Sequence, residues 1–475
     1  MTPRDRFLKV FPKAIADETA SVFVGAGVSI GAGYPSWKAL LHEIAEELGV
    51  SSSDVSDLAA LAQWSRRTDV LQVIRKEIAD LKPVPLPLEI LARLPIRHFW
   101  TTNYDRLIER AFEAISRPIE PISCARDLAI RVRPGAARLF KMHGTIEQLS
   151  DLVISTDDYE LYGNSRGAFL PMLQAHLTTM SMLFIGLSFT DPNVRHVLSF
   201  IRKNFTSNPP EHFAIVCRPH CSEFDSVSEF NSKQIQHKLW SADLIRYGLK
   251  VIEIDTYDEV PKLLQNVERL VAASRVWVSG SWPAEDQNTQ KISTVAYAVG
   301  KALADADFAL VTGSGLTVMP NTVGGFLQTL QRKGTWDLQR RLLVRPFPQP
   351  VNGGEPDRAQ WSALRAEMAR ISGAIVLIGG AKNQDGQIID ADGVEEELNA
   401  AKSVGAFLLP IGSTGGTAKS VCERLIGSYL VSDGNQAVRP NDAELKMLMN
   451  TDDPSEITSL VIKLLKKSRN GIERL

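Results

Sequence analysis

The sequence has few cysteines, no long apolar run and no excess of charge of one sign. Its cysteines, Cys124, Cys217, Cys221 and Cys422, include no CxxC pair, which excludes a four-thiolate zinc site and disfavours a disulfide framework. No apolar stretch approaches the roughly 18 residues of a membrane-spanning helix. The N-terminal residues also lack the uninterrupted apolar core of a signal peptide. We therefore expect a soluble, cytoplasmic protein that does not enter a membrane and holds no metal ion.

The balance of charges disfavours the binding of nucleic acid. Lys and Arg number 53 against 55 Asp and Glu, so the formal net charge is −2. A balance of this kind provides no electrostatic footprint for nucleic acid or for an anionic membrane surface. The chain is 44% hydrophobic and 23% charged, which is typical of a globular protein. We therefore expect no nucleic-acid partner.

The length and the pattern of apolar runs indicate more than one domain. At 475 residues the chain is about three times the usual length of one domain. In its first half, short apolar runs alternate with helical patterns, as in a parallel α/β sheet, and the alternation starts afresh after Ser274. We predict two Rossmann-like parallel-sheet domains, residues 1–273 and 274–475.

The predicted strands are apolar runs that end in glycine, serine or a polar residue. Those of the first domain lie in SVFVGAG (21–27), HFWTTNY (98–104), RLFKMHG (138–144), MSMLFIGLS (180–188), HFAIVC (212–217) and GLKVIEI (248–254). Those of the second lie in RVWVSGS (275–281), FALVTGSG (308–315), RLLVRPF (341–347), GAIVLIGG (373–380) and AFLLPIGSTGG (406–416). Helices are predicted over 36–48, 258–273 and 291–304, and the prolines of 82–87 predict a loop or a helix break.

At two strand ends of the first domain, glycine points to contact with a phosphate or a ribose. GAG at Gly25 to Gly27 follows the first strand, where glycines let the backbone approach a pyrophosphate and the next helix offers its N-terminus to the anion. A tight turn without a ligand is the alternative. Gly186 and Ser188 follow the fourth predicted strand and offer donors to a phosphate or a ribose. The Asp191-Pro192 step behind them is equally compatible with a simple helix start.

Two other strand ends carry groups for hydrogen bonding and proton transfer. Asn103 and Asp105 follow the second strand, and ligands of open parallel sheets bind at such ends. Asn103 is suited to holding a ribose hydroxyl or a water molecule, whereas Asp105 is equally suited to capping the next helix. His143 follows the third strand, and histidine is the usual proton acceptor near neutral pH, although a lone histidine is often structural.

The order GAGVS, TTNYD, HG and G-x-S resembles the sirtuin NAD-binding domain over roughly residues 15–270. The resemblance implies NAD phosphates at Gly25, Ala26, Gly27 and Ser29, the nicotinamide ribose at Asn103 and Asp105, a general base at His143, and adenosine at Gly186 and Ser188. The chain lacks the paired CxxC zinc module of sirtuins and has GYPSWK in place of their GIPDFR-like run. Both departures disfavour protein deacylation and make water the acceptor, so that NAD is hydrolysed to nicotinamide and ADP-ribose.

Residues 275–475 resemble the SLOG (LOG-like) superfamily through VWVSGS, TGSGLT and GVEEEL, and lack the PGGxGTxxE-type motif of its phosphoribohydrolases. We therefore expect this domain to bind a ligand without catalysis. Together with WTTNYDRLIE, FTDPN and RPFPQ, the two domains resemble the NAD-hydrolysing effectors of the Thoeris antiphage system. That resemblance implies activation by a cyclic ADP-ribose isomer made by a TIR-domain partner enzyme. By position, the pocket for this isomer would be lined by Ser279, Gly280, Arg370, Lys382 and Glu397.

Alternatives stay open for several of these assignments. Arg370 and Lys382 suit a pyrophosphate, but Arg370 also suits the C-terminal end of a helix dipole, and Lys382 lies in a polar segment. A zinc-less NAD-dependent deacylase and a non-catalytic NAD-sensing regulator are the alternative functions.

The family likeness implies a homo-tetramer or a larger assembly. The apolar residues of the N-terminal segment, Phe7, Leu8, Phe11 and Ile15, predict a helix that packs on a neighbour.

Overall fold

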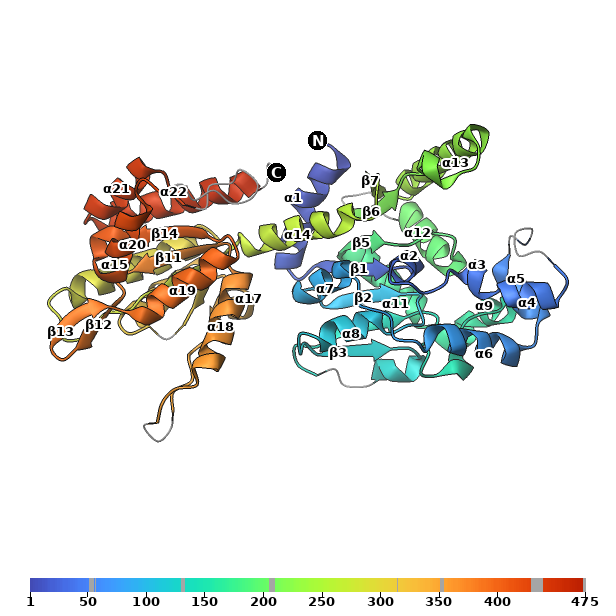
Figure 1. Ribbon diagram of the computed structural model, residues 1–475, viewed down its shortest axis with the longest axis horizontal. Helices are drawn as coiled ribbons and strands as arrows, with labels where there is room; N and C mark the ends of the chain where they lie inside the picture. Colours follow the sequence, from blue (N-terminus) through green and yellow to red (C-terminus); the bar gives the residue numbers. More distant parts are fainter. Residues whose placement is uncertain are drawn as a thin grey trace. The chain divides into compact units, whose positions relative to one another are not determined.

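The structure is a computed structural model that describes residues 1–50, 55, 57–129, 133–204, 210–313, 315–350, 354–428 and 439–472. Contacts divide the chain into two units, Met1–Glu268 and Arg269–Leu475 (Figure 1). Each unit is a parallel sheet covered by helices, which confirms the predicted fold class. The division falls within α14 (Glu259–Ala272), whereas the sequence placed the domain boundary just after this helix.

In the described part of the first unit, the strands form one parallel sheet in the order β3-β4-β2-β1-β5-β6-β7. Its strands are β1 (Ala20–Val24), β2 (His98–Thr101), β3 (Ile119–Ile122), β4 (Ala137–Lys141), β5 (Ser181–Ile185), β6 (His212–Cys217) and β7 (Leu249–Ile254). Val24 pairs with Thr101 and with Ile185, and Thr101 pairs with Lys141. The carboxyl ends of β4, β2, β1 and β5 therefore finish at the same edge, and all the predicted strands of this unit are confirmed.

The helices of this unit lie before, between and after the strands. They are α1 (Pro3–Ala16), α2 (Ala26–Gly31), α3 (Trp37–Leu40), α4 (His42–Glu47), α5 (Leu58–Trp64), α6 (Arg67–Ile78), α7 (Leu86–Arg93), α8 (Leu107–Glu113), η1 (Ala125–Ala129), η2 (Leu149–Asp151), α9 (Thr156–Glu160), α10 (Tyr162–Arg166), α11 (Phe169–Thr179), α12 (Pro192–Asn204), η3 (Cys221–Glu223), α13 (Val227–Arg246) and α14. The predicted helix over 36–48 is divided into α3 and α4. In the proline-rich segment, Pro85 is extended and α7 starts directly after it, with Pro87 in its first turn.

The apolar face of α1 is used within the chain. Phe7 and Phe11 are fully buried and pack on Phe213 of β6, with ring centroids 5.1 and 6.4 Å away. Ile15 is 1% exposed. The prediction that these side chains pack on a neighbouring molecule is therefore wrong for the aromatic stripe, because the helix covers its own sheet.

The second unit is built around a smaller parallel sheet in the order β10-β9-β8-β11-β14. Its strands are β8 (Arg275–Ser279), β9 (Ala309–Thr312), β10 (Leu342–Val344), β11 (Ala374–Ile378) and β14 (Phe407–Ile411), and β12 (Ala381–Gln384) and β13 (Gln387–Asp390) form an antiparallel hairpin. The helices are α15 (Thr289–Asp305), α16 (Val318–Lys333), α17 (Leu338–Arg341), α18 (Arg358–Ile371), α19 (Asp392–Ser403), η4 (Gly412–Thr414), α20 (Gly416–Leu425), α21 (Asp442–Asn450) and α22 (Pro454–Ile472). Ser314, within the quoted TGSGLT run, lies outside the described residues.

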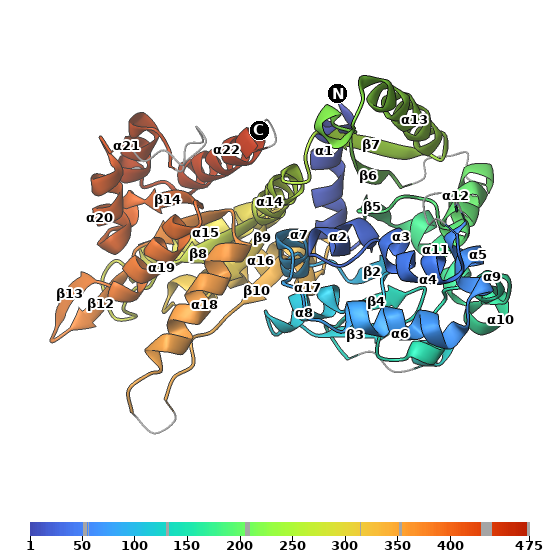
Figure 2. The same cartoon turned by 45° about the vertical axis from the view of Figure 1, so that its right-hand side comes forward.

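Both faces of this second sheet are buried. Side chains of α15, α16 and α22 form one apolar cluster with β8, β11 and β14, and side chains of α18, α19 and α20 form another. Figure 2 shows α18 and α19 next to each other. No helix in the described ranges is both long and apolar enough to cross a membrane.

Candidate functional site

Glycines allow the backbones of the turns after β1 and β5 to lie in direct contact. Gly25 N donates to Ile185 O at 2.8 Å, and Gly27 N donates to Gly186 O at 2.8 Å. A Cβ atom on Gly25 would lie 2.4 Å from Gly186 O, and Gly186 itself has a φ of +62°. Any side chain on Gly25 would push the two turns apart. These glycines therefore hold the two strand ends together, and their predicted contact with NAD phosphates stays a prediction, as it does for the exposed Ala26.

A hydrogen-bond network determines which way the Asn103 amide faces. Asn103 Nδ2 donates to Ser29 Oγ at 2.8 Å and to Gly25 O at 3.1 Å. Ser29 Oγ donates its only proton to Asp105 Oδ2 at 2.6 Å. Because Gly25 O can only accept, and Ser29 Oγ has no second proton, the amide nitrogen must lie on this side. The amide oxygen Oδ1 therefore faces the opposite way.

That amide oxygen is buried and has no hydrogen-bond partner in the described part of the chain. Leaving such an acceptor unpaired costs about 1–3 kcal/mol, so this orientation of the Asn103 amide lowers the stability of the fold. Thr145 Oγ1 and Asn193 Nδ2 are likewise buried without a described partner, after β4 and β5. The sequence analysis did not single out these two residues. Each of these three atoms has a hydrogen-bonding capacity that no described residue uses.

Asp105 has the helix-starting role that the sequence left open. Its Oδ1 accepts from Leu107 N at 2.9 Å, where α8 begins, and its Oδ2 is occupied by Ser29. Beneath it, the fully buried Lys141 donates from Nζ to Asp105 O at 2.5 Å and to Glu109 Oε1 at 2.8 Å. Both carboxylate oxygens of Asp105 are thus used inside the protein. A contact of Asp105 with ribose stays a prediction.

His143 follows β4 and is 6% exposed. Its Nε2 lies 2.9 Å from Asp191 Oδ2, although the approach is not linear enough for a regular hydrogen bond. Such bent contacts are common in enzymes without substrate. The Tyr159 ring meets the imidazole edge-on at 5.5 Å, and its hydroxyl donates to Asp191 Oδ2 at 3.3 Å. Sequence reasoning considered Asp191 only as a helix start and missed this contact.

Asp191 is a carboxylate in this setting. Burial raises the pKa of Asp191, but its attraction to His143, together with the hydrogen bonds from Val194 N and the Tyr159 hydroxyl, outweighs burial and holds that pKa below its usual range. Asp191 Oδ1 accepts from Val194 N at 2.9 Å at the start of α12. The residue therefore contacts a helix end with one oxygen and the histidine with the other.

Ser188 does not point into this group. It is exposed, and its Oγ lies 2.8 Å from Thr190 Oγ1. Between them Phe189 has a φ of +57° and is 5% exposed, packed on Phe184. The turn after β5 is thus anchored by Phe189. The contact of Ser188 with adenosine stays a prediction.

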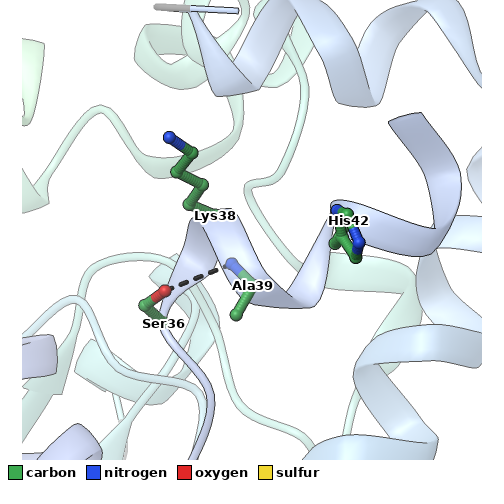
Figure 3. Close-up of a pocket in the computed structure, with 4 residues that line it drawn as sticks. All are labelled: Ser36, Lys38, Ala39 and His42. Carbon is green, nitrogen blue, oxygen red and sulfur yellow. Dashed lines mark hydrogen bonds between the residues drawn. The ribbon is translucent and has the colours of Figure 1, made fainter. Parts of the chain in front are cut away.

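A surface cavity of about 340 Å³ lies beside α3 and α4 (Figure 3). It is lined by Ser36, Lys38, Ala39 and His42, from the GYPSWK run and the helix after it. Ser36 Oγ accepts from Ala39 N at 3.1 Å and so starts α3. None of these lining residues belongs to the group around Asn103 and His143.

In the second unit, three buried polar residues come together from the end of β8 and from the middle of α18 and α19. Glu397 is 8% exposed, and burial raises its pKa to about 7, against the opposing effects of Ser279 and Arg365. Ser279 Oγ is buried and has no described hydrogen-bond partner. Arg365 is 6% exposed, and its guanidinium lies over the Phe347 ring at 4.9 Å. A Cβ atom on Gly393, in the first turn of α19, would lie 3.4 Å from Arg365 Nη2.

Arg365, which the sequence did not single out, is the buried cation of this group, whereas the predicted ligand contact of Arg370 stays a prediction. Arg370 is exposed in the last turn of α18, as the helix-dipole alternative predicted, because it does not share the buried helix face of Arg365. Lys382 lies on β12, partly exposed, with its Nζ 2.5 Å from Asp392 Oδ2. Gly280 has a φ of +151°, and a Cβ atom there would lie 1.9 Å from Ile378 O, so it packs β8 on β11.

Comparisons with known proteins match both units. Residues 97–245 match a family described as SIR2-like domain, and residues 259–468 match the Sir2- and TIR-associating SLOG family. NAD(+) hydrolase ThsA of Bacillus cereus (strain MSX-D12) is 33% identical over 88% of this chain and 89% of the relative. NAD(+) hydrolase ThsA of Acinetobacter baumannii (strain 532279) is 27% identical over 96% of this chain and 97% of the relative. Defense-associated sirtuin 2 of Bacillus subtilis is 27% identical over 45% of this chain and 22% of its own length. Both predicted domain resemblances are confirmed.

Proposed function

Because this chain belongs to the family of the NAD(+) hydrolases named ThsA, it is an NAD(+) hydrolase, and we propose that Asn103 and His143 carry the reaction. The observation that supports this most is the Asn103 amide, whose nitrogen is committed to Ser29 and Gly25 and whose oxygen is left buried and unpaired. His143 follows the strand next to that of Asn103. The two side chains therefore start from adjacent strand ends.

In the proposed reaction, the bond between the nicotinamide nitrogen and the ribose carbon breaks, and its electron pair leaves with the nitrogen. Nicotinamide is positively charged in NAD, so its departure needs little help from an acid. The carbon develops positive charge and bonds to the oxygen of a water molecule. Asn103 Oδ1 accepts a hydrogen bond from that water, and His143 accepts its proton, for which general-base catalysis contributes about 10²–10⁴-fold. The products are nicotinamide, ADP-ribose and a proton.

On this proposal, the second unit contains a pocket for an activating cyclic ADP-ribose isomer. The buried Arg365 beside the first turn of α19 suits a pyrophosphate, and Lys382 adds a second cation. Ser279 and Glu397 suit ribose hydroxyls, because they place a buried hydroxyl beside a buried carboxyl group. Gly280 follows Ser279 at the end of β8, and a backbone contact with the ligand there is part of the proposal.

Membership of this family supports a proposal for the wider role. We propose that a TIR-domain partner enzyme makes the activator, as the description of the SLOG family suggests, and that activation depletes NAD in bacterial antiviral defence. The assembly would be a homo-tetramer or larger and act in the cytoplasm. NAD hydrolysis by this chain needs no metal ion in the mechanism above, since the leaving group already carries charge.

Nicotinamide release from NAD by the full chain, with and without cyclic ADP-ribose isomers, tests the proposal. Asn103→Ala and His143→Ala are expected to lose release, whereas His42→Ala, an exposed histidine of α4 paired with Glu46, is expected to keep it. Retained release in both active-site variants would refute the catalytic assignment. O-acetyl-ADP-ribose from acetyl-lysine peptides would indicate the deacylase, and NAD binding without turnover would indicate the sensing regulator.

A further inference from the structure

Asp191 comes to His143 from a distant part of the sheet. The two residues follow β5 and β4, which are separated in the sheet by β1 and β2. The loop after β5 must therefore cross the carboxyl ends of both intervening strands to bring Asp191 Oδ2 within 2.9 Å of His143 Nε2. The side chains are 9% and 8% exposed, so water screens this contact weakly.

A simple structural explanation of Asp191 does not account for this contact. As the residue that starts α12, Asp191 needs only Oδ1, which accepts from Val194 N. Oδ2 is not needed there, yet it faces His143 and also accepts from the Tyr159 hydroxyl. Tyr159 lies edge-on to the same imidazole. Two neighbours thus fix the carboxylate and the ring relative to each other.

The contact also determines the tautomer of the histidine. A carboxylate oxygen accepts and cannot donate, so neutral His143 carries its proton on Nε2, towards Asp191. The lone pair that can take a proton is then on Nδ1. When Nδ1 is protonated, the ring becomes an imidazolium with a negative charge 2.9 Å from its other nitrogen. Asp191 therefore both orients the base and stabilises the charge that it acquires.

We propose that Asp191 is a positioning residue for NAD hydrolysis, which acts through His143 by holding its Nε2–H tautomer so that Nδ1 accepts the proton. The proposal rests on the proposed function, in which His143 is the general base. It adds a residue from the FTDPN run to the group around Asn103, and it assigns the proton to one of the two ring nitrogens.

Asp191→Asn separates this role from the start of α12. Asparagine starts helices as well as aspartate does, so its side-chain oxygen can keep the bond from Val194 N. Its NH₂ group then faces His143 and favours the tautomer with the proton on Nδ1, which cannot act as a base there. We expect kcat for nicotinamide release to fall about 10²–10⁴-fold, the range of general-base catalysis, while KM changes less than about threefold. Asp191→Ser, which also starts helices but cannot pair with an imidazolium, is expected to behave in the same way.

Asp127 provides a matched control. It accepts from the backbone of Ser123 and Cys124 at a 3-10 helix, as Asp191 does at α12, but does not contact His143. Asp127→Asn is expected to keep wild-type kcat. If both Asp191 variants keep kcat within threefold of wild type while His143→Ala loses activity, the positioning role is refuted and the proposed function stands.

A double-mutant cycle distinguishes action through His143 from a general structural effect. In the His143→Ala background, Asp191→Asn is expected to leave the residual release unchanged, because the residue through which it acts is gone. An equal fall in both backgrounds would overturn the proposal. Full activity of His143→Ala alone would instead refute the proposed function, whatever Asp191 does.

Discussion

Glu397 makes the stability of the second unit depend on pH. The pKa of a glutamate is 4.5 without perturbation and rises to about 7 for Glu397 in the folded protein, because burial disfavours the charged form. Between these values the folded state keeps a proton that the unfolded state releases. Stability therefore falls as the pH rises from 4.5 to 7, and the whole loss is present above pH 7. A difference of about 2.5 pKa units corresponds to about 3 kcal/mol.

Glu397→Gln removes this loss, because the amide is uncharged at every pH. Near pH 5 the variant and the wild type are expected to have similar melting temperatures. At pH 8 the variant is expected to melt about 6–12 °C higher, since about 1 kcal/mol shifts the Tm of a domain of roughly 200 residues by about 2–4 °C. Calorimetry of the full chain at both pH values measures this difference.

The neighbouring glutamate is the control for this experiment. Glu396 precedes Glu397 on α19, and its side chain is 54% exposed, so Glu396→Gln is expected not to reproduce the gain at pH 8. A melting difference between Glu397→Gln and wild type that is the same at pH 5 and pH 8 would contradict a raised pKa of Glu397. It would mean that Glu397 is ionised in the folded protein throughout this range.

Two further predictions concern the candidate sites. Ser29→Ala removes the group that joins Asn103 to Asp105, so we expect unfolding to be easier by about 2–4 kcal/mol in denaturant titrations and nicotinamide release to fall, because the Asn103 amide can then rotate. Release at the wild-type rate with the stability loss present would show that the orientation of this amide does not matter. Arg365→Met, compared with Arg370→Met, is expected to raise the concentration of cyclic ADP-ribose isomer for half-maximal activation at least about tenfold, because only Arg365 is buried beside Glu397 and α19. An equal effect of the two variants would contradict the choice of Arg365.

The strands were predictable because the central strands of a parallel sheet are buried on both faces and form continuous apolar runs. β3 was missed because it is short, contains Pro121 and lies at the sheet edge, where proline is tolerated. The β12–β13 hairpin was missed because its strands are polar, although Asp385-Gly386 is a typical hairpin turn. Local apolar patterns therefore predict buried strands better than exposed ones.

The candidate site was predictable where it depends on strand ends and not where it depends on strand order. Asn103 and His143 were found because polar residues that follow apolar runs lie at the ligand-binding edge. Asp191 reaches His143 only because the loop after β5 crosses the ends of β1 and β2, a path that depends on the strand order and that no local pattern contains. Arg365 was missed because a buried arginine and the exposed Arg370 look alike in one helical sequence.

Local sequence patterns also do not show what the apolar face of α1 packs against. The spacing of Phe7 and Phe11 predicts a helix with one apolar face, and this helix is present. It does not predict what covers that face, which is Phe213, about 200 residues along the chain. The aromatic stripe was therefore assigned to a neighbouring molecule although it belongs to the core of its own domain.

The role of the Asn103 amide oxygen is tested by the rate of nicotinamide release by full-length Asn103→Ala, measured beside wild type under the condition that activates wild type most. Wild type is expected to release nicotinamide and ADP-ribose in equal amounts. Asn103→Ala is expected to release neither above background while it melts as a folded protein. Release by Asn103→Ala at the wild-type rate would contradict this role, because the buried amide oxygen would then have no part in the reaction.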